Sequence, residues 1–475
     1  MDTRFVPGSR PRLAVAVLSM LALAGCASFS KDGGFTSVED TTRQRIGKDV
    51  KWVRSDADRD VLARQVDGLL AKPLSADDAV QIALYNNRGL QAAFQELGLS
   101  EVDLVQAGRL PNPRFQMFWA RNNGEYKIEQ TLTMNIFALI TLPLAQEVGQ
   151  RRFERAQREA AMDVLRLAAD TRKAWTLAVA AEESVRYARQ VRTVADTGAE
   201  LARRMEATGN WNRLQRNREQ GFYADAALNL ARAEQAAITA RERLTRLLGL
   251  WGEQVRYRLP ERLPDLPKAA DDLPNIEQLA MEQRLDLQAV RLETEALAKN
   301  LGLTKATRFI NVLELGPGRV REGSSSDPWK NGFEVGFEIP LFDWGTARVA
   351  RAEAIYLQAV NRAAETAINA RSEVRETYQG YRASYDIAKH YRDEIVPLRK
   401  RISDENLLRY NGMLIGTFEL LADARAQIAS VNSYLDALRD YWLARADLDM
   451  ALIGRPTPGG APAPALSPVQ AAAGH

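Results

Sequence analysis

Histidine and cysteine are nearly missing from this chain of 475 residues, which has two histidines and one cysteine. His475 is the last residue, so only His390 and Cys26 lie inside the chain. A thiol-histidine nucleophile, or a zinc site built from cysteine and histidine, needs several such side chains in one place. We therefore expect no enzyme, no metal site and no cofactor.

An excess of charge of one sign is also missing. The chain has 64 lysines and arginines against 61 aspartates and glutamates, and the two signs are interspersed. Domains that bind nucleic acid usually carry a strongly basic surface, so we expect no nucleic-acid partner. With 46% hydrophobic residues, the composition is that of a folded chain rather than a disordered one.

A hydrophobic run of transmembrane length is missing too. The apolar stretch 13–24 follows three arginines and is too short to span a bilayer permanently. It ends in Leu-Ala-Gly-Cys26, which resembles the lipobox of bacterial lipoproteins. This resemblance implies cleavage after Gly25 and attachment of lipid to Cys26, and the alanine that follows points to the outer membrane. An ordinary signal peptide that contains a cysteine is the alternative.

Helix-breaking residues are absent from long stretches of the chain. No proline occurs from Leu144 to Leu259, and no glycine from Gln150 to Thr197. A helix from Leu144 to about residue 208 would be about 100 Å long at about 1.5 Å per residue. Its seam, with apolar residues three and four apart, is mostly alanine, which favours many helices packed side by side. Gly209-Asn210 predicts a reversal into a return helix that ends near Leu248.

The same plan occurs a second time. Each copy opens with a helix of ordinary length, at Ser75 and at Leu273-Pro274, and continues into strands that close on Pro-Leu at Pro143 and Pro340. The second long helix runs from Thr346 to Tyr410, turns at Asn411-Gly412 and returns from Thr417. Pro397 interrupts it and predicts a kink or a short break. The polar stretch before the first copy reads as an extended N-terminal arm.

Strict alternation of polar and apolar residues predicts a pair of β-hairpins, and hence four strands. The polar positions are Glu129, Thr131, Thr133, Asn135, Glu334 and Glu338. The apolar positions are Phe115, Trp119, Leu132, Met134, Phe333, Val335, Phe337 and Ile339. Alternation alone favours a small half-buried sheet on a soluble core. The long helices favour a membrane sheet instead, and since a membrane barrel needs about eight strands, partner chains must complete it.

Several motifs together resemble the TolC-like outer-membrane factor family (outer membrane efflux proteins), in its lipoprotein subtype. They are the lipobox, Leu74-Ser75, Pro143-Leu144, the segment Ile339–Gly345, and Tyr410-Asn411-Gly412 running into Phe418–Ala424. The resemblance covers residues 73–454. It implies a mainly α chain with membrane β-strands, which as a homotrimer forms a twelve-stranded β-barrel joined to a long antiparallel α-helical conduit.

The same resemblance implies function and location. The protein would be the outer-membrane exit duct of a tripartite efflux system, passing small toxic solutes from a periplasmic adaptor (membrane fusion) protein and an inner-membrane pump. It would be lipid-anchored in the bacterial outer membrane and extend into the periplasm. A periplasmic coiled-coil lipoprotein scaffold without a pore is the alternative, but a scaffold has no use for four amphipathic strands.

Site residues follow from the resemblance. It places adaptor docking at the helix-hairpin tips, Gly209 and Gly412, both of which we expect to be left-handed helix caps. It implies a gate near Tyr410, Glu419 and Asp423, although the two acids also suit the first turns of a helix. No base lies in residues 413–417, so we expect no lock between a tyrosine and an arginine. The polar strand positions should line the channel, because lipid-facing charges are costly.

These expectations divide the chain into six segments. They are a signal peptide (1–25), an N-terminal arm with the lipid anchor (26–72), a first repeat (73–260), a linker (261–272), a second repeat (273–454) and a disordered tail rich in proline and alanine (455–475).

Overall fold

A computed structural model describes residues 28–309, 312–324 and 326–456. The predicted signal peptide, the lipidation residue Cys26 and the chain beyond residue 456 lie outside the described residues. The helices are α2 (Thr36–Ile46), α3 (Asp56–Leu70), α4 (Ala76–Asn86), α5 (Arg88–Ala107), α6 (Ile136–Ala207), α7 (Arg213–Leu248), η1 (Gly252–Arg256), α8 (Ile276–Gln283), α9 (Leu285–Ala306), α10 (Thr346–His390), η2 (Tyr391–Ile395), α11 (Val396–Asn411) and α12 (Thr417–Ala451). The strands are β1 (Arg114–Asn122), β2 (Glu125–Asn135), β3 (Leu313–Gly323) and β4 (Lys330–Phe337).

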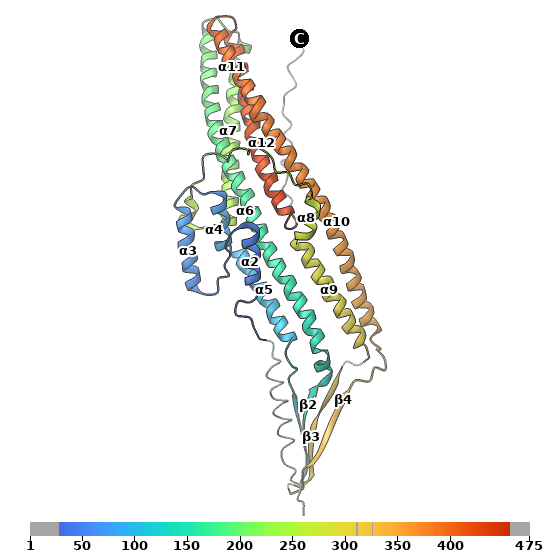
Figure 1. Cartoon of the computed structure of the whole chain (residues 1–475). Helices are drawn as coiled ribbons and strands as arrows, with labels where there is room; N and C mark the ends of the chain where they lie inside the picture. Colours follow the sequence, from blue (N-terminus) through green and yellow to red (C-terminus); the bar gives the residue numbers. More distant parts are fainter. Residues whose placement is uncertain (1–27, 310–311, 325, 457–475) are drawn as a thin grey trace, which may run out of the picture. The chain divides into compact units, whose positions relative to one another are not determined.

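The chain forms two compact units, and each takes segments from both sequence repeats. Unit 1 comprises the described residues up to Arg45 together with Gln91–Ala161 and Leu285–Ile368. It holds the sheet and, side by side, most of α5, the first part of α6, α9 and the first part of α10 (Figure 1). Unit 2 comprises Ile46–Leu90, Met162–Arg284 and the described residues from Asn369. It holds the rest of the long helices with their hairpin tips.

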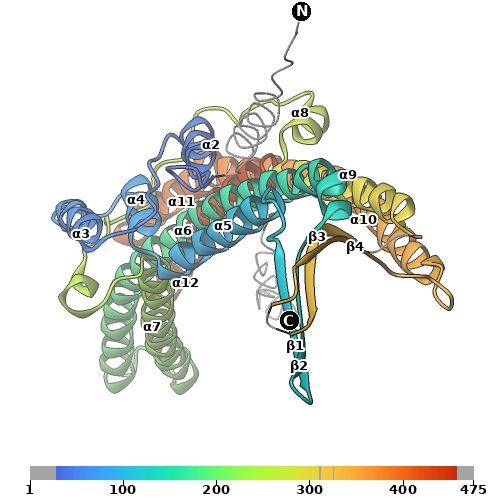
Figure 2. The same cartoon turned by 90° about the horizontal axis from the view of Figure 1, so that it is seen from below.

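The sheet of unit 1 is antiparallel, with strand order β1-β2-β3-β4. Figure 2 shows its two hairpins side by side. Asn123 and Gly124 both have positive φ, 45° and 95°, as a two-residue hairpin turn requires. The four strands predicted from alternation are confirmed.

Strand β3 runs through a sequence that is typical of turns. Gly316-Pro317-Gly318 lies inside the strand, which continues to Gly323. The reason lies partly at Gly316, where a Cβ atom would come within 1.8 Å of the Leu132 carbonyl oxygen of β2. Glycine thus allows a close approach of two backbones, and here the Gly-Pro-Gly sequence serves a strand rather than a turn.

The first Pro-Leu junction also differs from its prediction. The expected strand from Tyr126 to Leu142 is wrong beyond Asn135, and Pro143 lies inside α6. Asn135 begins the helix, because its side-chain oxygen accepts a hydrogen bond from the Ala138 N–H at 3.0 Å. The following apolar residues suit a helix as well as a strand. In the second repeat, Pro340 does lie between the strand β4 and the helix α10, as predicted.

The opening helix of each repeat is broken in two, which the sequence did not predict. Asn87 separates α4 from α5 and Arg284 separates α8 from α9, both with extended backbone. Each side chain binds the C-terminal carbonyls of the long return helix of its own repeat. Asn87 donates to the Leu247 oxygen at 2.9 Å, and Arg284 to the Ala451 oxygen at 3.4 Å. The break therefore caps a neighbouring helix end.

Pro397 is accommodated by a change of helix type. The chain passes from α10 through the π-helical turn η2, in which the Val396 N–H bonds to the Tyr391 oxygen, and α11 begins there. The wider turn relieves the clash that proline makes in a regular α-helix, so the predicted break takes this form.

The N-terminal arm is not extended as expected, because it contains α2 and α3. Ser55 and Asp58 form a reciprocal capping box at the start of α3, and Leu62 and Val66 are buried beneath it. The predicted linker is likewise held against the core of unit 2, since Leu263 and Leu266 are buried there.

The core of unit 2 is built from the alanine-rich seam of α6 and a cluster of aromatic residues. Val164, Ala174 and Ala178 are fully buried, as the periodicity predicted. The Trp175 indole N–H donates to the Leu74 carbonyl oxygen at 2.7 Å. Within the described residues, none of the helices carries an apolar stretch that would suffice to cross a bilayer.

Candidate functional site

The sheet sorts its side chains into two chemically distinct faces. Residues opposite each other on paired strands share a face, and faces alternate along a strand. Thr131 lies opposite Gln116 and Gly318, which fixes the register across three strands. What we call the polar face then carries Arg114, Gln116, Asn122, Glu125, Lys127, Glu129, Thr131, Thr133, Asn135, Glu314, Glu322, Lys330 and Glu334, together with Phe118, Ala120, Val320 and several glycines.

The other face, which we call the apolar face, is rich in large hydrophobic residues. It carries Phe115, Met117, Trp119, Arg121, Tyr126, Ile128, Gln130, Leu132, Met134, Leu313, Leu315, Pro317, Arg319, Arg321, Asn331, Phe333, Val335 and Phe337. Within the described chain, many of these are well exposed: Trp119 by 62% and Phe333 by 67%. The two sets predicted from alternation therefore separate onto opposite faces wherever they lie in strands.

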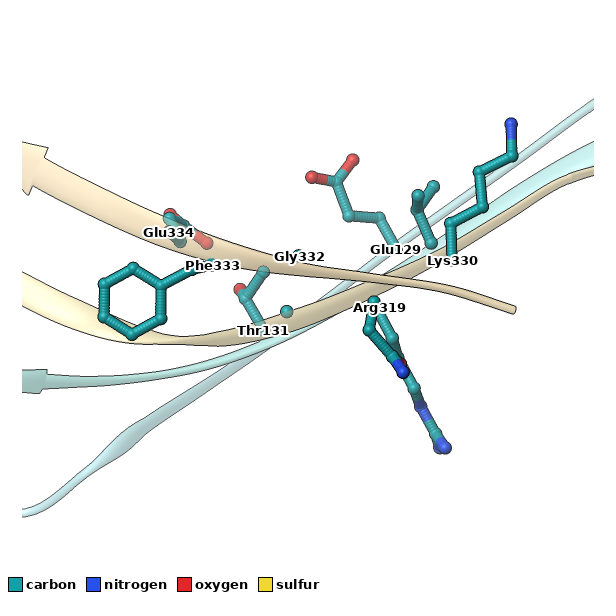
Figure 3. A pocket seen from close by; sticks show the side chains of 10 residues that line it. Glu129, Thr131, Arg319, Lys330, Gly332, Phe333 and Glu334 are labelled. Atoms are coloured by element: carbon teal, nitrogen blue, oxygen red, sulfur yellow. The ribbon is translucent and has the colours of Figure 1, made fainter.

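The polar face is hollowed. A hollow of about 230 Å³ is lined by Glu129 and Thr131 of β2 and by residues 318–320 of β3 and 330–334 of β4, which include Arg319, Lys330, Phe333 and Glu334. In Figure 3 the side chains of Glu129 and Lys330 extend to the same side of the sheet, while Arg319 extends to the other side. Ion pairs lie on this face, Arg114 with Glu314 at 3.1 Å and Lys127 with Glu129 at 3.5 Å. Such a surface suits water and ions rather than acyl chains.

Predicted positions near the strand ends fall outside the sheet. Glu338 and Ile339 follow the last residue of β4, so neither belongs to a strand. The strand pairing of β4 ends at Phe337, opposite Leu313, so the alternation in the sequence runs past the end of the strand.

The first helix-hairpin tip has the geometry that the sequence predicted. Gly209 has φ of +76°, the left-handed region that favours glycine. Asn212 then caps α7, with its side chain accepting from the Gln215 N–H at 2.9 Å and the Gln215 side chain accepting from the Asn212 N–H. The tip is therefore a tight turn fixed by backbone conformation and by a capping box.

At the second tip, the expectation for Gly412 is wrong. Gly412 has φ of −81°, and the left-handed residue is Met413, with φ of +61°. The Leu414 N–H closes the turn onto the Arg409 oxygen, which requires the left-handed step one residue later. Met413 is 93% exposed and Leu414 77%. The tip thus presents two large apolar side chains, one of them in an unfavourable backbone conformation.

The three gate candidates lie close to this tip. The Thr417 hydroxyl donates to the Tyr410 hydroxyl at 3.4 Å, which ties the ends of α11 and α12 together. Glu419 lies in the exposed first turn of α12, and Asp423 follows one turn later. One carboxylate oxygen of Asp423 is shielded from solvent, and among the described residues it has no hydrogen-bond partner.

Sequence reasoning missed a set of contacts between α7 and α12. Trp211 packs edge-on against Phe418, with ring centroids 6.5 Å apart. Glu219, whose side chain is 2% exposed, forms an ion pair with Arg425. The Arg425 guanidinium also lies 4.7 Å from the centroid of Phe222. The only signal in the sequence was an arginine and a glutamate on separate helices, and spacing along the chain cannot pair them.

Comparisons with known proteins agree with this geometry. The sequence profile of a family described as outer membrane efflux protein matches residues 276–402. The cobalt-zinc-cadmium resistance protein CzcC of Cupriavidus metallidurans is 25% identical over 288 residues. That match covers 57% of this chain and 63% of CzcC, so the chain spans less than two thirds of the length of this relative.

Solved structures share the fold. CusC, in a structure whose description refers to transmembrane channel formation, matches with a TM-score of 0.66 and 18% identity, over 80% of this chain and 92% of CusC. The CmeC outer membrane channel of Campylobacter jejuni matches with a TM-score of 0.65 and 16% identity, over 79% of this chain and 85% of CmeC.

Proposed function

Because the chain is similar in sequence and fold to outer membrane efflux proteins, we propose that it is the outer-membrane exit duct of a tripartite efflux system. The duct receives small toxic solutes from a periplasmic adaptor protein and an inner-membrane pump and releases them outside the cell. CzcC, which is named for resistance to metals, supports toxic solutes as the cargo class.

One observation carries the proposal: the sheet has two open edges and two unlike faces. Within the described residues, β1 and β4 each pair with one strand only. Unpaired backbone groups cost several kcal/mol each in lipid, so a membrane sheet must close. The smallest membrane barrels have about eight strands, so several copies must contribute. Three copies supply twelve strands, and the β1 edge of one copy pairs with the β4 edge of the next.

In this barrel the polar face lines the lumen and the apolar face contacts acyl chains. The lumen-facing residues are Glu129, Thr131, Thr133, Asn135 and Glu334. Glu338 follows the last residue of β4, at the end of the barrel that leads into the helices. The hollow over Glu129 and Glu334 and the ion pairs of this face support the assignment. The reverse orientation would expose carboxylates to lipid, at a cost of several kcal/mol for each carboxylate.

The helix-hairpin tips carry both the gate that closes the duct and the surface that contacts the adaptor. We assign Tyr410, Glu419 and Asp423 to the gate, where acids from three copies converge. Glu419 is exposed in the first turn of α12, where it can face the same residue of a neighbouring copy. The tips at Gly209 and Gly412 meet the adaptor, and the exposed Met413 and Leu414 supply apolar area at the second tip.

The lipid anchor is Cys26, which lies outside the described residues. The segment that follows it is fixed to unit 1, because the Ser30 N–H donates to the Glu101 carboxylate at 2.7 Å and Phe35 packs on Phe94. Incorporation of labelled palmitate into the protein, and its loss in Cys26→Ser, tests the anchor.

Conductance in planar bilayers tests the duct. A closed gate would keep the unmodified protein silent, so the informative variant is Glu419→Ala with Asp423→Ala, which we expect to conduct. Asp404→Ala, which removes an exposed carboxylate from α11 near the same tip, is the matched control and should stay closed. A double variant that assembles but never conducts would favour the scaffold without a pore.

A deletion strain identifies the cargo class. It should become sensitive to some of a panel of dyes, detergents, antibiotics and metal ions. Unchanged tolerance to every compound would refute export of toxic solutes.

A further inference from the structure

The acidic residues of the sheet are confined to one of its two faces, whereas basic residues lie on both. All five strand carboxylates, Glu125, Glu129, Glu314, Glu322 and Glu334, lie on the polar face. The apolar face carries three charged residues within the described strands, and all are arginines: Arg121, Arg319 and Arg321. The charged residues of the apolar face, which we place against lipid, are therefore all positive.

These arginines lie at the hairpin end of the strands. The opposite strand ends lead into helices, and Arg121 is next to the last residue of β1 while Arg321 is two residues from the end of β3. An arginine on a lipid-facing surface costs about 2–4 kcal/mol at the bilayer midplane but only about 0–1 kcal/mol near the headgroups. Position alone thus assigns them to the headgroup level on the side away from the helices.

Two of the guanidinium groups share one aromatic ring. The Arg319 guanidinium lies 4.6 Å from the centroid of Trp329, and that of Arg321 lies 5.0 Å from the same centroid. Arg321 also lies 5.6 Å from the Tyr126 ring. The Nε–H of Arg319 donates to the Gln130 side chain at 2.7 Å. Aromatic rings at this level and basic groups stacked on them are typical of a membrane–water interface.

The partner of Arg319 is a neutral amide, and within the described chain no carboxylate pairs with it. The nearby loop acid Asp327 accepts a hydrogen bond from the Ser324 N–H at 2.7 Å. In Figure 3 the Arg319 side chain extends away from the polar face. Planar guanidinium groups bind phosphate through paired hydrogen bonds, and here two of them lie within about 10 Å of each other around one ring.

We propose that Arg319, Arg321 and Trp329 form a binding site on the outside of the barrel for the phosphate group of an outer-leaflet lipid. Arg121, on the same face of β1, adds positive charge at the rim. The acyl chains of the lipid would lie on the apolar band that includes Phe333 and Val335. The inference rests on the proposed function, because that function places this end of the sheet in the outer leaflet.

The test titrates phosphorylated lipid A into the purified full-length trimer in neutral detergent and counts bound lipid by native mass spectrometry. At about 1 kcal/mol for each arginine, Arg319→Gln or Arg321→Gln should weaken binding roughly fivefold, and the double variant roughly 25- to 30-fold. Arg319→Lys should lie between wild type and Arg319→Gln, because it keeps the charge but loses the paired geometry.

The matched control removes two positive charges at the same level from the opposite face. Lys330 pairs with Val320, between the two arginines, and Lys127 pairs with Glu322. Lys127→Gln with Lys330→Gln should leave lipid binding unchanged. Equal loss in this control, or undiminished binding in the arginine double variant, would overturn the site.

Further arms identify the ligand. Dephosphorylated lipid A should bind the wild type no better than the phosphorylated lipid binds the double variant. Inorganic phosphate in excess should not displace the lipid, and full displacement would show a site for free phosphate instead. Trimers that conduct after gate loosening but bind lipid A independently of the arginines would defeat this inference alone. Failure to form a channel would defeat the proposed function.

Discussion

The guanidinium group of Arg284 lies 2.8 Å from the carboxylate of Glu373, with the arginine side chain 1% exposed. The same group also donates to the carbonyl oxygens of Ala370 and Ala451. One side chain therefore ties the break between α8 and α9 to α10 and to the C-terminal end of α12. A buried charge of this kind is stable only while all its partners are in place.

Replacing this residue should destabilise unit 2. Arg284→Met leaves Glu373, among the described residues, with the more distant Arg455 as its ion-pair partner, at 3.6 Å, and leaves carbonyl groups unsatisfied. We therefore expect a loss of roughly 3 kcal/mol in the free energy of unfolding. Thermal unfolding followed by far-UV circular dichroism measures it. Arg375→Gln, which breaks the exposed pair with Glu277, is the control and should cost less than about 1 kcal/mol. Equal effects of the two variants would contradict a special role for Arg284.

Removing the contact between α7 and α12 should loosen the gate. Glu219→Gln takes away the charge that holds Arg425, while Trp211 and Phe418 stay in contact, so α12 should separate from α7 more readily. We expect more frequent opening in planar bilayers, with the size of the single-channel current unchanged. Glu200→Gln, which breaks an exposed ion pair with Arg203 on α6, should behave like the wild type. If Glu219→Gln stays as silent as this control, the contact does not hold the tip closed.

The sequence predicted the elements that depend on local patterns. Alternation gave the strand faces, and the lack of proline and glycine gave the long helices. What it missed depends on partners that are distant along the chain. Arg284 breaks a helix because the carbonyls of α12 lie beside it, and Gly316 serves a strand because the backbone of β2 comes close. At the second tip, turn chemistry suggested Gly412, whereas the closing hydrogen bonds place the left-handed residue at Met413.

Acid should release the segment that follows the lipid anchor. Hydrogen bonds from the Thr36 hydroxyl and backbone lower the pKa of Asp32 to about 2. Since the folded pKa lies below the usual value of 3.8, the stabilisation is complete above about pH 4 and is lost as the pH falls toward 2. The protection of residues 30–46 against hydrogen exchange, taken relative to the intrinsic exchange rate at each pH, should therefore fall in this range. Asp32→Asn should show low protection already at neutral pH, with little further loss in acid; a variant as protected as the wild type would refute the role of Asp32.

The lumen should prefer cations. The polar face carries five strand carboxylates against Arg114, Lys127 and Lys330, a net charge of −2 for each chain. Three copies around one water-filled pore concentrate this charge, so cations should enter more readily than anions. Reversal potentials in a potassium chloride gradient, with the gate loosened by Glu419→Ala and Asp423→Ala, measure the preference.

Glu129→Gln with Glu334→Gln should remove most of the cation preference, because this double variant brings the polar face of each chain to neutrality. Lys330→Gln should strengthen the preference. Since Arg319 lies on the other face, Arg319→Gln should leave the reversal potential unchanged. A shift with Arg319→Gln as large as that with Lys330→Gln would show that the assignment of the two faces is wrong.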